Sequence, residues 1–498
     1  MDSTYHHVHL KPLDRSFQVA DGTPLIDVLH EYGIEFPCGG KGTCGACKVQ
    51  VVGGDIKLDE AHQQALDQLD LSGGWRLACM SRVTQDITLE VGQWQTFILA
   101  DNSPFEFIPR EGYGIAVDLG TTTLVAQLVD LQKGRVINAA TAANPQGRYG
   151  GDVMSRVEYA VTHNTHQMTR LIRGAIYKLM DQLLSGHSLK LEKIVLVGNT
   201  VMHHLFCDLD LTPLATYPFE GQDKGPQSFT PSSLGWTLPG DPQILFIPPV
   251  GGFVGSDILA GILASRMHQK QSISCLIDLG TNGEIVAGNL AGMVCASTAA
   301  GPAFEGTNIS MGMTATTGAL ASFDGNHTPL QYHIIGNESP RGICGSGLID
   351  SVAWLQQSGQ MDMWGKLTDE RERIEVVPGI AITQQDIREV QLAKAAIAAG
   401  IHIVSKKAGA DPAMIQEVFL AGAFGTYLNL ANARHMGLIE FEEGKVTRLG
   451  NSALIGAKML LYYDWESIQP LFENITHISL ETDPGFQELY AMNMLFEV

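Results

Sequence analysis

The apolar positions of this chain follow two different patterns, which meet near residue 112. Up to Val91, short runs typical of β-strands alternate with one or two short helical segments. Between Gly92 and Gly112 the pattern weakens, and two prolines and an asparagine interrupt it. We therefore predict a first domain over residues 1–92 and a linker over residues 93–112.

From Gly114 onward the pattern becomes that of an α/β protein. Apolar runs of strand length alternate with helical segments, and each run leads into a glycine-rich turn. The strand runs cover residues 115–117, 194–197, 275–278 and 418–420.

Two of these turns are close repeats of each other. Residues 118–123 read Asp-Leu-Gly-Thr-Thr-Thr, and residues 278–283 read Asp-Leu-Gly-Thr-Asn-Gly, each at the end of an apolar strand run. A strand-and-turn unit that recurs about 160 residues later indicates two lobes of related architecture. We predict the first lobe over residues 113–268 and the second over residues 269–498.

Length and charge narrow the functional classes. A chain of 498 residues is too long for a single hydrophobic core, which supports several packed units. Its formal net charge of −21 makes it poorly suited to bind the phosphate backbone of a nucleic acid. It has no run of about eighteen apolar residues that would predict a membrane-spanning helix, and its N-terminal residues lack the pattern of a secretory signal. We therefore expect a cytoplasmic protein whose unligated thiols are reduced.

Four cysteines in the first domain indicate an iron–sulfur cluster. Cys38, Cys44 and Cys47 share one short loop, and Cys79 follows on a later strand. A [2Fe–2S] cluster needs four thiolates, two for each iron. Because glycine lacks the Cβ that opposes positive φ, a glycine-rich loop can wrap three corners of the cluster. The glycines of this loop are Gly39, Gly40, Gly42 and Gly45.

Other sites are less consistent with the spacing of these cysteines. A zinc site usually shows paired Cys-x2-Cys hooks, whereas these cysteines are grouped three plus one. Disulfide bonds are disfavoured by the expected cytoplasmic location. The Cys-x5-Cys-x2-Cys spacing resembles that of the adrenodoxin-like ferredoxins, and this resemblance implies a β-grasp fold for the first domain.

The repeated Asp-Leu-Gly-Thr turns predict two phosphate sites. At the end of a strand, such a turn places a carboxylate beside exposed backbone amides and a hydroxyl, which can hold phosphate oxygens. Because Mg²⁺ keeps most of its water ligands, the aspartate can orient the ion through water. We assign this role to Asp118 and Asp278. The residues expected to contact phosphate are Gly120, Thr121, Thr122, Gly280, Thr281 and Asn282.

Two more acidic residues and one more loop belong to the same prediction. Glu284 and Asp257 are candidates for orienting the water that attacks the phosphate, with a surface or capping role as the alternative for each. Residues 421–425 read Ala-Gly-Ala-Phe-Gly, and the small side chains let a nucleoside lie against the backbone. We expect Gly422, Ala423 and Gly425 to approach this nucleoside.

These three segments together resemble the acetate and sugar kinase–Hsp70–actin (ASKHA) superfamily, whose domains have a two-lobed, ribonuclease H-like fold. The resemblance assigns residues 118–123 and 278–284 to two phosphate motifs and residues 421–425 to an adenosine motif. It places connecting helices near residues 253–264 and over residues 452–458. It therefore implies a domain that binds ATP and Mg²⁺.

The fusion of a ferredoxin-like domain to such a nucleotide-binding domain is more specific than either part. It resembles the reductive activators of corrinoid proteins, and residues 197–204, 248–257, 300–306 and 342–350 support this resemblance. The resemblance implies that the chain hydrolyses ATP and passes an electron through its cluster to reduce Co(II) corrinoid to Co(I). The implied partners are a corrinoid protein of a methyltransferase system, an upstream electron donor and a second copy of the chain.

Two other functions remain open from the sequence. One is an ATP-dependent activator of a radical dehydratase or reductase, although those relatives hold a four-iron cluster between two subunits with cysteines of the nucleotide-binding fold. The other is a non-enzymatic, nucleotide-gated redox sensor. The separate N-terminal position of the four cysteines favours the corrinoid activator over the first alternative.

Overall fold

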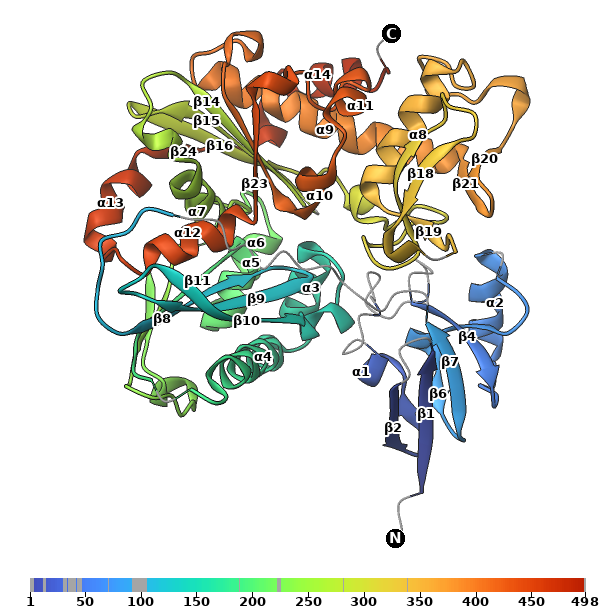
Figure 1. Ribbon diagram of the computed structural model, residues 1–498, viewed down its shortest axis with the longest axis horizontal. Helices are drawn as coiled ribbons and strands as arrows, with labels where there is room; N and C mark the ends of the chain where they lie inside the picture. The colour runs from blue at the N-terminus through green and yellow to red at the C-terminus, as the bar shows by residue number, and fades with distance from the viewer. Residues whose placement is uncertain are drawn as a thin grey trace.

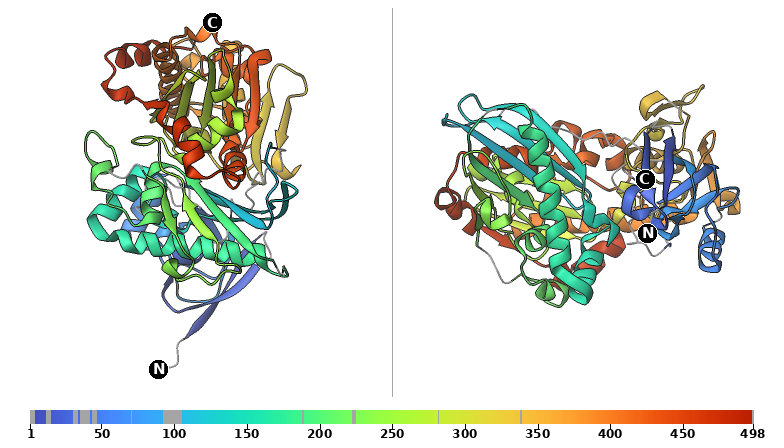
Figure 2. Two further views of the ribbon diagram at one scale, coloured as in Figure 1. Left: turned by 90° about the vertical axis from the view of Figure 1, so that its left-hand side faces the viewer. Right: turned by 90° about the horizontal axis from the view of Figure 1, so that it is seen from below.

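The computed structural model describes residues 4–11, 15–29, 34, 42, 47–69, 71–91, 105–187, 189–221, 225–280, 282–337 and 339–496. The two lobes of the main body lie one above the other, and the smaller N-terminal domain lies to one side of them (Figures 1 and 2). No helix among the described residues is both long and apolar enough to span a lipid bilayer.

A five-stranded mixed sheet with the order β2-β1-β7-β4-β5 forms the N-terminal domain. Strand β1 is antiparallel to β2 and parallel to β7, and β4 is antiparallel to both β7 and β5. Alternate residues such as Val8, Leu10 and Leu89 are fully buried in its core, and the arrangement confirms the predicted β-grasp fold. The elements are β1 (Tyr5–Lys11), β2 (Arg15–Ala20), β3 (Thr23–Pro24), α1 (Ile26–Leu29), β4 (Lys48–Gly53), α2 (Glu60–Gln68), β5 (Trp75–Leu77), β6 (Arg82–Val83) and β7 (Ile87–Val91).

A six-stranded sheet with the order β10-β9-β8-β11-β13-β12 forms the first lobe. Strands β8, β9 and β10 are antiparallel neighbours, whereas β8, β11 and β13 run parallel. Helix α4 packs against β9 and β10 on one face of this sheet. The elements are β8 (Tyr113–Leu119), β9 (Thr123–Asp130), β10 (Arg135–Ala143), α3 (Val153–Tyr159), α4 (Thr165–Leu184), β11 (Leu191–Gly198), α5 (Thr200–Cys207), α6 (Thr212–Ala215), β12 (Gln227–Phe229) and β13 (Gln243–Phe246).

The second lobe repeats this topology around a second six-stranded sheet. Its order is β23-β22-β14-β15-β16-β24, so five of its strands match the order and directions of β13-β11-β8-β9-β10. This match confirms the internal repeat predicted from the two turns. The elements are β14 (Ser274–Leu279), β15 (Gly283–Asn289), β16 (Gly292–Thr298), α9 (Gln384–Lys407), β22 (Val418–Ala421), α10 (Gly422–Tyr427), α11 (Leu430–His435), β23 (Val446–Gly450), α13 (Trp465–Glu473), β24 (Ile475–His477) and α14 (Phe486–Met492).

A smaller subdomain, which the sequence did not predict, is inserted into the second lobe between β16 and α9. It forms one three-stranded and one two-stranded sheet, and it lies on the side of the second lobe nearest the N-terminal domain (Figure 1). Its elements are β17 (Ala319–Asp324), β18 (Gln331–Ile334), β19 (Gly342–Ile343), α8 (Gly345–Gln357), β20 (Arg373–Val377) and β21 (Ile380–Thr383).

Two buried helices, α7 (Ser256–Ser265) and α12 (Ser452–Leu460), pack together between the two sheets. A Cβ atom at Gly456 would collide with the backbone of Ala260, so glycine is needed for this close crossing. The two helices lie where the sequence predicted the connecting helices, with α7 starting three residues later than expected.

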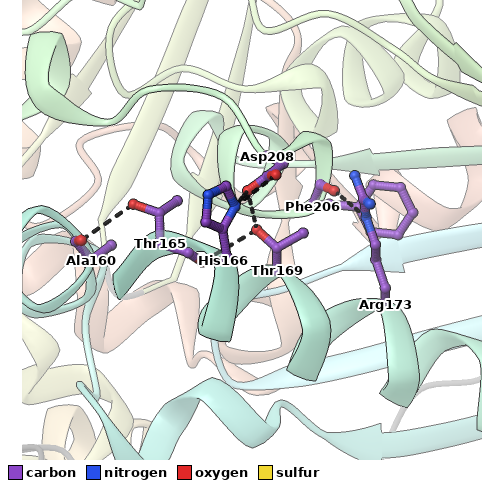
Figure 3. A network of polar contacts seen from close by, with 7 residues as sticks. All are labelled: Ala160, Thr165, His166, Thr169, Arg173, Phe206 and Asp208. Atoms are coloured by element: carbon purple, nitrogen blue, oxygen red, sulfur yellow. Dashed lines mark hydrogen bonds and ion pairs between the residues drawn. The ribbon is translucent and has the colours of Figure 1, made fainter. Parts of the chain in front are cut away.

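Polar contacts fix α4 of the first lobe to the end of α5 (Figure 3). Asp208, in the left-handed region with φ of 61°, accepts a hydrogen bond from the Thr169 hydroxyl at 3.0 Å and lies 2.8 Å from Nδ1 of His166. The Arg173 guanidinium donates to the carbonyl oxygen of Phe206 at 2.8 Å. These contacts hold α5 in place, and its opposite end lies at the cavity described next.

Candidate functional site

A cavity of about 630 Å³ lies between the two lobes, and both predicted phosphate turns contribute to its wall. Its lining also contains residues from α7, from α10 and from the inserted subdomain. The predicted site residues that line it are Asp118, Gly120, Thr121, Thr122, Asp257, Asp278, Gly280, Asn282, Glu284 and Gly422.

The first turn joins β8 to β9 and is held by three asparagine contacts. The Gly120 N–H donates to the carbonyl of Thr123 at 3.1 Å, which closes the turn. The Asn144 side chain donates to the Gly120 carbonyl at 2.9 Å, and its backbone N–H donates to the Thr122 carbonyl at 2.8 Å. Asn199 donates to the Thr121 hydroxyl at 2.8 Å. The turn is therefore fixed before any ligand contacts it.

The second turn has the same setting in the second lobe, between β14 and β15. The Gly280 N–H donates to the Asn282 carbonyl at 3.0 Å. Thr281, which we expected to contact phosphate, lies outside the described residues. Both turns therefore join antiparallel strands, whereas the sequence pattern predicted strands followed by helices. In each lobe the strand after the turn folds back and forms main-chain hydrogen bonds with the strand before it, β9 with β8 and β15 with β14.

Four of the carboxyl groups that line this cavity have raised pKa values. Burial raises the pKa of Asp118 to about 6, although a hydrogen bond from Asn451 lowers it. Burial and the charge of Asp118 raise the pKa of Asp278 to about 7. Burial and the charges of Asp278 and Asp118 raise the pKa of Asp257 to about 8. Burial, followed by the charges of Asp257 and Asp278, raises the pKa of Glu284 well above its usual range. The four groups therefore repel one another within one enclosed site.

No three acidic, histidine or cysteine side chains of the described residues lie close enough together to bind a metal ion directly, so this donor set suits a hard divalent cation held through its water ligands. Mg²⁺ prefers oxygen ligands, and a bound cation would offset the burial and the mutual repulsion that raise these pKa values. Asp118 and Asp278 each lie near the end of the strand that leads into a phosphate turn, so they approach the cavity from opposite lobes. Asp257 reaches it from the first turn of α7, and Glu284 from β15.

The predicted adenosine segment is only partly at the cavity. Gly422 has a φ of +85°, and a Cβ atom there would lie 2.7 Å from a carboxylate oxygen of Asp278. Gly422 therefore makes room for this aspartate. Gly425 does not line the cavity, because it packs against the Leu420 side chain inside the lobe. Of Ala423, only the main chain, in α10, is described.

Phe424 supplies the larger surface at this end of the cavity. Its ring is stacked on that of Phe304, with the centroids 4.9 Å apart and the planes 5° apart. Both rings line the cavity. Neither phenylalanine could be assigned to the site from the sequence, because the two residues lie more than a hundred positions apart and only folding brings their rings together.

Two of the four predicted cluster cysteines lie side by side in the N-terminal domain. The sulfur atoms of Cys47 and Cys79 are 3.3 Å apart, well beyond the 2.05 Å of a disulfide bond. The pairing of β4 with β5 brings them together, because Lys48 is opposite Leu77. Gly42 has the positive φ predicted for the loop, at +74°. Cys38 and Cys44 lie outside the described residues, as do Gly39, Gly40 and Gly45.

A buried histidine that the sequence analysis missed supports Cys79. Nε2 of His62 accepts a hydrogen bond from the Leu77 N–H at 2.9 Å, two residues before this cysteine. His62 is 1% exposed, and burial, with a contribution from Arg76, lowers its pKa. The neutral imidazole therefore holds the end of β5.

Three asparagines are the other functional residues that the sequence analysis missed. Asn144 and Asn199 hold the first turn, and Asn451 donates to Asp118 at 2.9 Å. Each also caps the N-terminus of the helix that follows it. Their signal in the sequence is an asparagine directly after a strand run and before a helical segment, a position that favours N-caps.

Three family models match the chain. A 2Fe-2S iron-sulfur cluster binding domain matches residues 8–84, and a RACo middle region matches residues 113–270. The C-terminal domain of RACo, described as the ASKHA domain, matches residues 272–498. These ranges correspond to the N-terminal domain, the first lobe and the second lobe.

Two curated relatives and one solved structure are similar over most of the chain. The corrinoid activation enzyme RamQ of Eubacterium limosum is 36% identical over 440 residues, which are 80% of this chain and 74% of RamQ. The Co(II) methylated amine-specific corrinoid protein reductase of Methanosarcina barkeri is 25% identical over 77% of each chain. The structure of a reductive activator for corrinoid, iron-sulfur protein covers 99% of this chain and 98% of its own, with 25% identity and a TM-score of 0.68. Because RamQ is more than one-third identical over most of both sequences, this chain belongs to the family of reductive activators of corrinoid proteins.

Proposed function

We propose that this chain hydrolyses ATP to drive the transfer of one electron from its iron–sulfur domain to the Co(II) centre of a corrinoid protein, which becomes Co(I). The names of RamQ and of the Methanosarcina reductase support this activity. The observation that carries it is the cavity in which two phosphate turns and four carboxyl groups from both lobes meet. The same chain holds two cysteines side by side in a ferredoxin-like domain.

In the N-terminal domain, Cys47 and Cys79 are proposed to ligate the cluster together with Cys38 and Cys44. When bound, a [2Fe–2S] cluster supplies one-electron transfer at low potential, about −400 mV for plant-type centres. The chain holds Cys79 in place through the His62 contact to Leu77 and keeps Cys47 away from solvent, at 1% exposure. Low exposure and fixed ligands tune the potential of such a site.

In the two-lobed body, Asp118 and Asp278 are proposed to orient Mg²⁺ through its water ligands. The amides of the two turns, with Thr121, Thr122 and Asn282, would hold the phosphate oxygens. The four carboxyl groups would repel one another less with a cation bound, so its binding would favour a smaller separation of the two lobes. We propose that the nucleoside lies near Gly422 and Ala423, beside the Phe424 ring.

Glu284 and Asp257 are proposed to orient the attacking water. Glu284 accepts a hydrogen bond from the Ser297 hydroxyl at 3.3 Å, which aims its carboxyl group. Asp257 lies in the first turn of α7, where it accepts a hydrogen bond from the Ile258 N–H at 2.9 Å. Either carboxylate can take the proton of the water once the cation has lowered its pKa.

The free energy of moving an electron from the cluster to a cobalt centre of lower potential explains why ATP is needed. A one-electron equilibrium changes tenfold for about every 59 mV. A transfer that is uphill by roughly 240 mV therefore needs a shift of about 10⁴-fold, or about 5.5 kcal/mol. We propose that a nucleotide that closes the two lobes supplies this free energy and favours a docked state in which the cobalt accepts the electron. Hydrolysis then releases the complex.

The remaining expectations stay proposals of the same kind. We propose an upstream electron donor, Mg²⁺ as the nucleotide's cation, a methyltransferase system as the source of the corrinoid protein, and a homodimer. We also propose domain bounds at 1–92, 113–268 and 269–498 with a linker over 93–112, supported by the ranges of the three family models.

The test is a reduction assay. The purified protein with its cluster, a chemical reductant and a Co(II) corrinoid protein are mixed with and without Mg–ATP, and Co(I) is followed by its absorbance. We expect Co(I) to form at least tenfold faster with ATP. Equal rates with and without ATP, in protein that hydrolyses ATP, would overturn the proposed activity and leave the redox sensor as the better reading.

A further inference from the structure

We propose that Arg148 and Arg341 are positioning residues that hold the iron–sulfur domain against both lobes at once, so that its orientation follows the separation of the lobes. This inference rests on the proposed function and adds the contacts through which the nucleotide cavity would control the cluster domain. It follows from two interdomain contacts and from the way each arginine is anchored.

The two contacts lie on different parts of the iron–sulfur domain. Nη1 of Arg148 lies 3.5 Å from Oδ1 of Asp27, in α1. Nη1 of Arg341 lies 3.5 Å from the carbonyl oxygen of Val91 and 3.9 Å from the carboxylate of Glu90, at the end of β7. The arginine side chains are only 20% and 26% exposed, so both are largely covered.

Arg148 is anchored to the first phosphate turn. It ends the 3₁₀ turn Pro145–Arg148, which begins after Asn144, and its guanidinium lies over the Tyr149 ring at 5.0 Å. Asn144 donates both its backbone N–H and its side-chain amide to the turn at Gly120 and Thr122. The element that carries Arg148 is therefore tied to this turn, and it moves with the first lobe when the lobes change their separation.

Arg341 is anchored to the opposite wall of the cavity. Its backbone N–H donates to the Gly318 carbonyl at 2.9 Å. A Cβ atom at Gly318, where φ is +90°, would lie 2.7 Å from the Arg341 side chain, so the glycine leaves room for its stem. Strand β19 follows directly, and Cys344, Gly345 and Ser346 after it line the cavity.

The consequence is a mechanical link between nucleotide and cluster domain. The N-terminal domain has one sheet and one core, so Asp27 and Glu90 keep a fixed separation. Arg148 and Arg341 belong to different lobes, so their separation changes when the lobes close. Both contacts are therefore satisfied in only one arrangement of the lobes. By linkage, a nucleotide that changes this arrangement changes the position of the domain, and docking of the domain changes nucleotide affinity by the same factor.

Distances between spin labels test this link without using activity. The labels are carried by unnatural amino acids, so that no cysteine is added. One label replaces the exposed Tyr5 in the N-terminal domain. The other replaces the exposed Arg170 in the first lobe in one sample and the exposed Trp364 in the second lobe in a second sample, which gives two label distances. They are measured in cluster-loaded protein with and without Mg²⁺ and a non-hydrolysable ATP analogue. We expect at least one of the two label distances to shift when the nucleotide analogue binds.

Charge reversal and rescue separate positioning from a merely structural role. An ion pair of this exposure changes an equilibrium by about two- to fivefold, so R148D and R341E should each lower the equilibrium constant for docking by about this factor. The double variant R148D/R341E should show a broad distance distribution that is the same with and without the nucleotide analogue. The swapped pair D27R/R148D should restore the shift. R371E, which breaks an exposed ion pair 3.1 Å long within the second lobe, is the matched control and should behave as the wild type.

If charge reversal disturbs folding, the milder variants R148Q and R341Q replace R148D and R341E. An unchanged visible spectrum of the cluster shows that the iron–sulfur domain of each variant is folded and loaded. A wild-type distance that stays fixed while the nucleotide analogue is bound would overturn the inference, as would a double variant that shifts like the wild type. Co(I) formation measured on the same wild-type sample separates the two proposals. ATP-dependent Co(I) with fixed distances refutes only this inference, whereas shifting distances without Co(I) refute only the proposed activity.

Discussion

The Asn451 side chain donates a hydrogen bond of 2.9 Å to the Asp118 carboxylate, across 333 residues of sequence and from the second half of the fold to the first. Asn451 also caps α12, because its side-chain oxygen accepts a hydrogen bond from the Leu454 N–H at 2.8 Å. One side chain thus fixes both a connecting helix and the carboxylate proposed to orient Mg²⁺.

Replacing Asn451 by alanine should weaken nucleotide hydrolysis more than it weakens the fold. Without this donor, Asp118 loses the hydrogen bond that holds its carboxylate, and contacts of this kind typically change activity or metal affinity by about 10- to 100-fold. We expect the Mg²⁺ concentration that gives half-maximal ATP hydrolysis to rise by about that factor. N451D keeps the cap but brings another carboxylate beside Asp118, so it should be at least as impaired. A wild-type Mg²⁺ dependence in both variants would argue against this role.

A methyl group at Gly422 should disturb the cation site. Positive φ costs an alanine about 1–2 kcal/mol, and its Cβ would press on Asp278. G379A is the matched control, because Gly379 has the same φ of +85° with nothing within 4 Å of the added carbon. We expect G422A to raise the Mg²⁺ requirement of ATP hydrolysis at least tenfold and G379A to leave it unchanged. Equal effects of the two substitutions would assign the loss to backbone strain alone.

Cys79→Ser should remove the visible absorbance of the cluster while ATP binding persists. The serine oxygen is a poor replacement for a thiolate, and Cys79 lies 3.3 Å from Cys47 where two ligands are expected. Cys207, buried in α5 of the first lobe, provides the control, because C207A should keep the full spectrum. A C79S protein that retains its visible spectrum would refute the ligand assignment.

The iron–sulfur domain should lose stability as the pH falls below about 6.5. Burial lowers the pKa of His62 in the folded state, whereas an unfolded histidine titrates near 6.5. Below that value the unfolded chain binds a proton that the folded domain excludes, so the free energy of unfolding decreases with decreasing pH. The temperature at which the visible absorbance is lost should drop between pH 7.5 and 5.5. H62Q, which cannot titrate but can accept from Leu77, should show a smaller drop, and an identical drop would exclude His62 as the cause.

The local parts of this architecture could be predicted from the sequence, and the long-range parts could not. Asp118 and Asp278 were identified because strand, aspartate and glycine-rich turn are adjacent in the chain, and the sheet topology confirms the repeat they indicated. Asn451 was missed because its partner lies in the other lobe. Gly425 was expected near adenosine, but which side of α10 faces the cavity depends on packing against Leu420.

The inserted subdomain was missed for a different reason. Its strand β19 has only two residues and β18 is almost entirely exposed, so neither has the apolar alternation that predicts a strand. Its position beside the iron–sulfur domain, and with it the Arg341 contact to Val91, depends on the folded arrangement of three separate segments.

We propose that ATP bound in the cavity between the lobes drives electron transfer from the separate iron–sulfur domain. The most direct measurement is ATP-dependent Co(I) formation by Asp278→Asn protein with an intact cluster spectrum. Removing this carboxylate from the cation site should lower ATP hydrolysis by about a hundredfold or more, and we predict that Co(I) formation falls to the rate seen without ATP. Co(I) formation at the wild-type rate, in a variant that no longer hydrolyses ATP, would contradict the account.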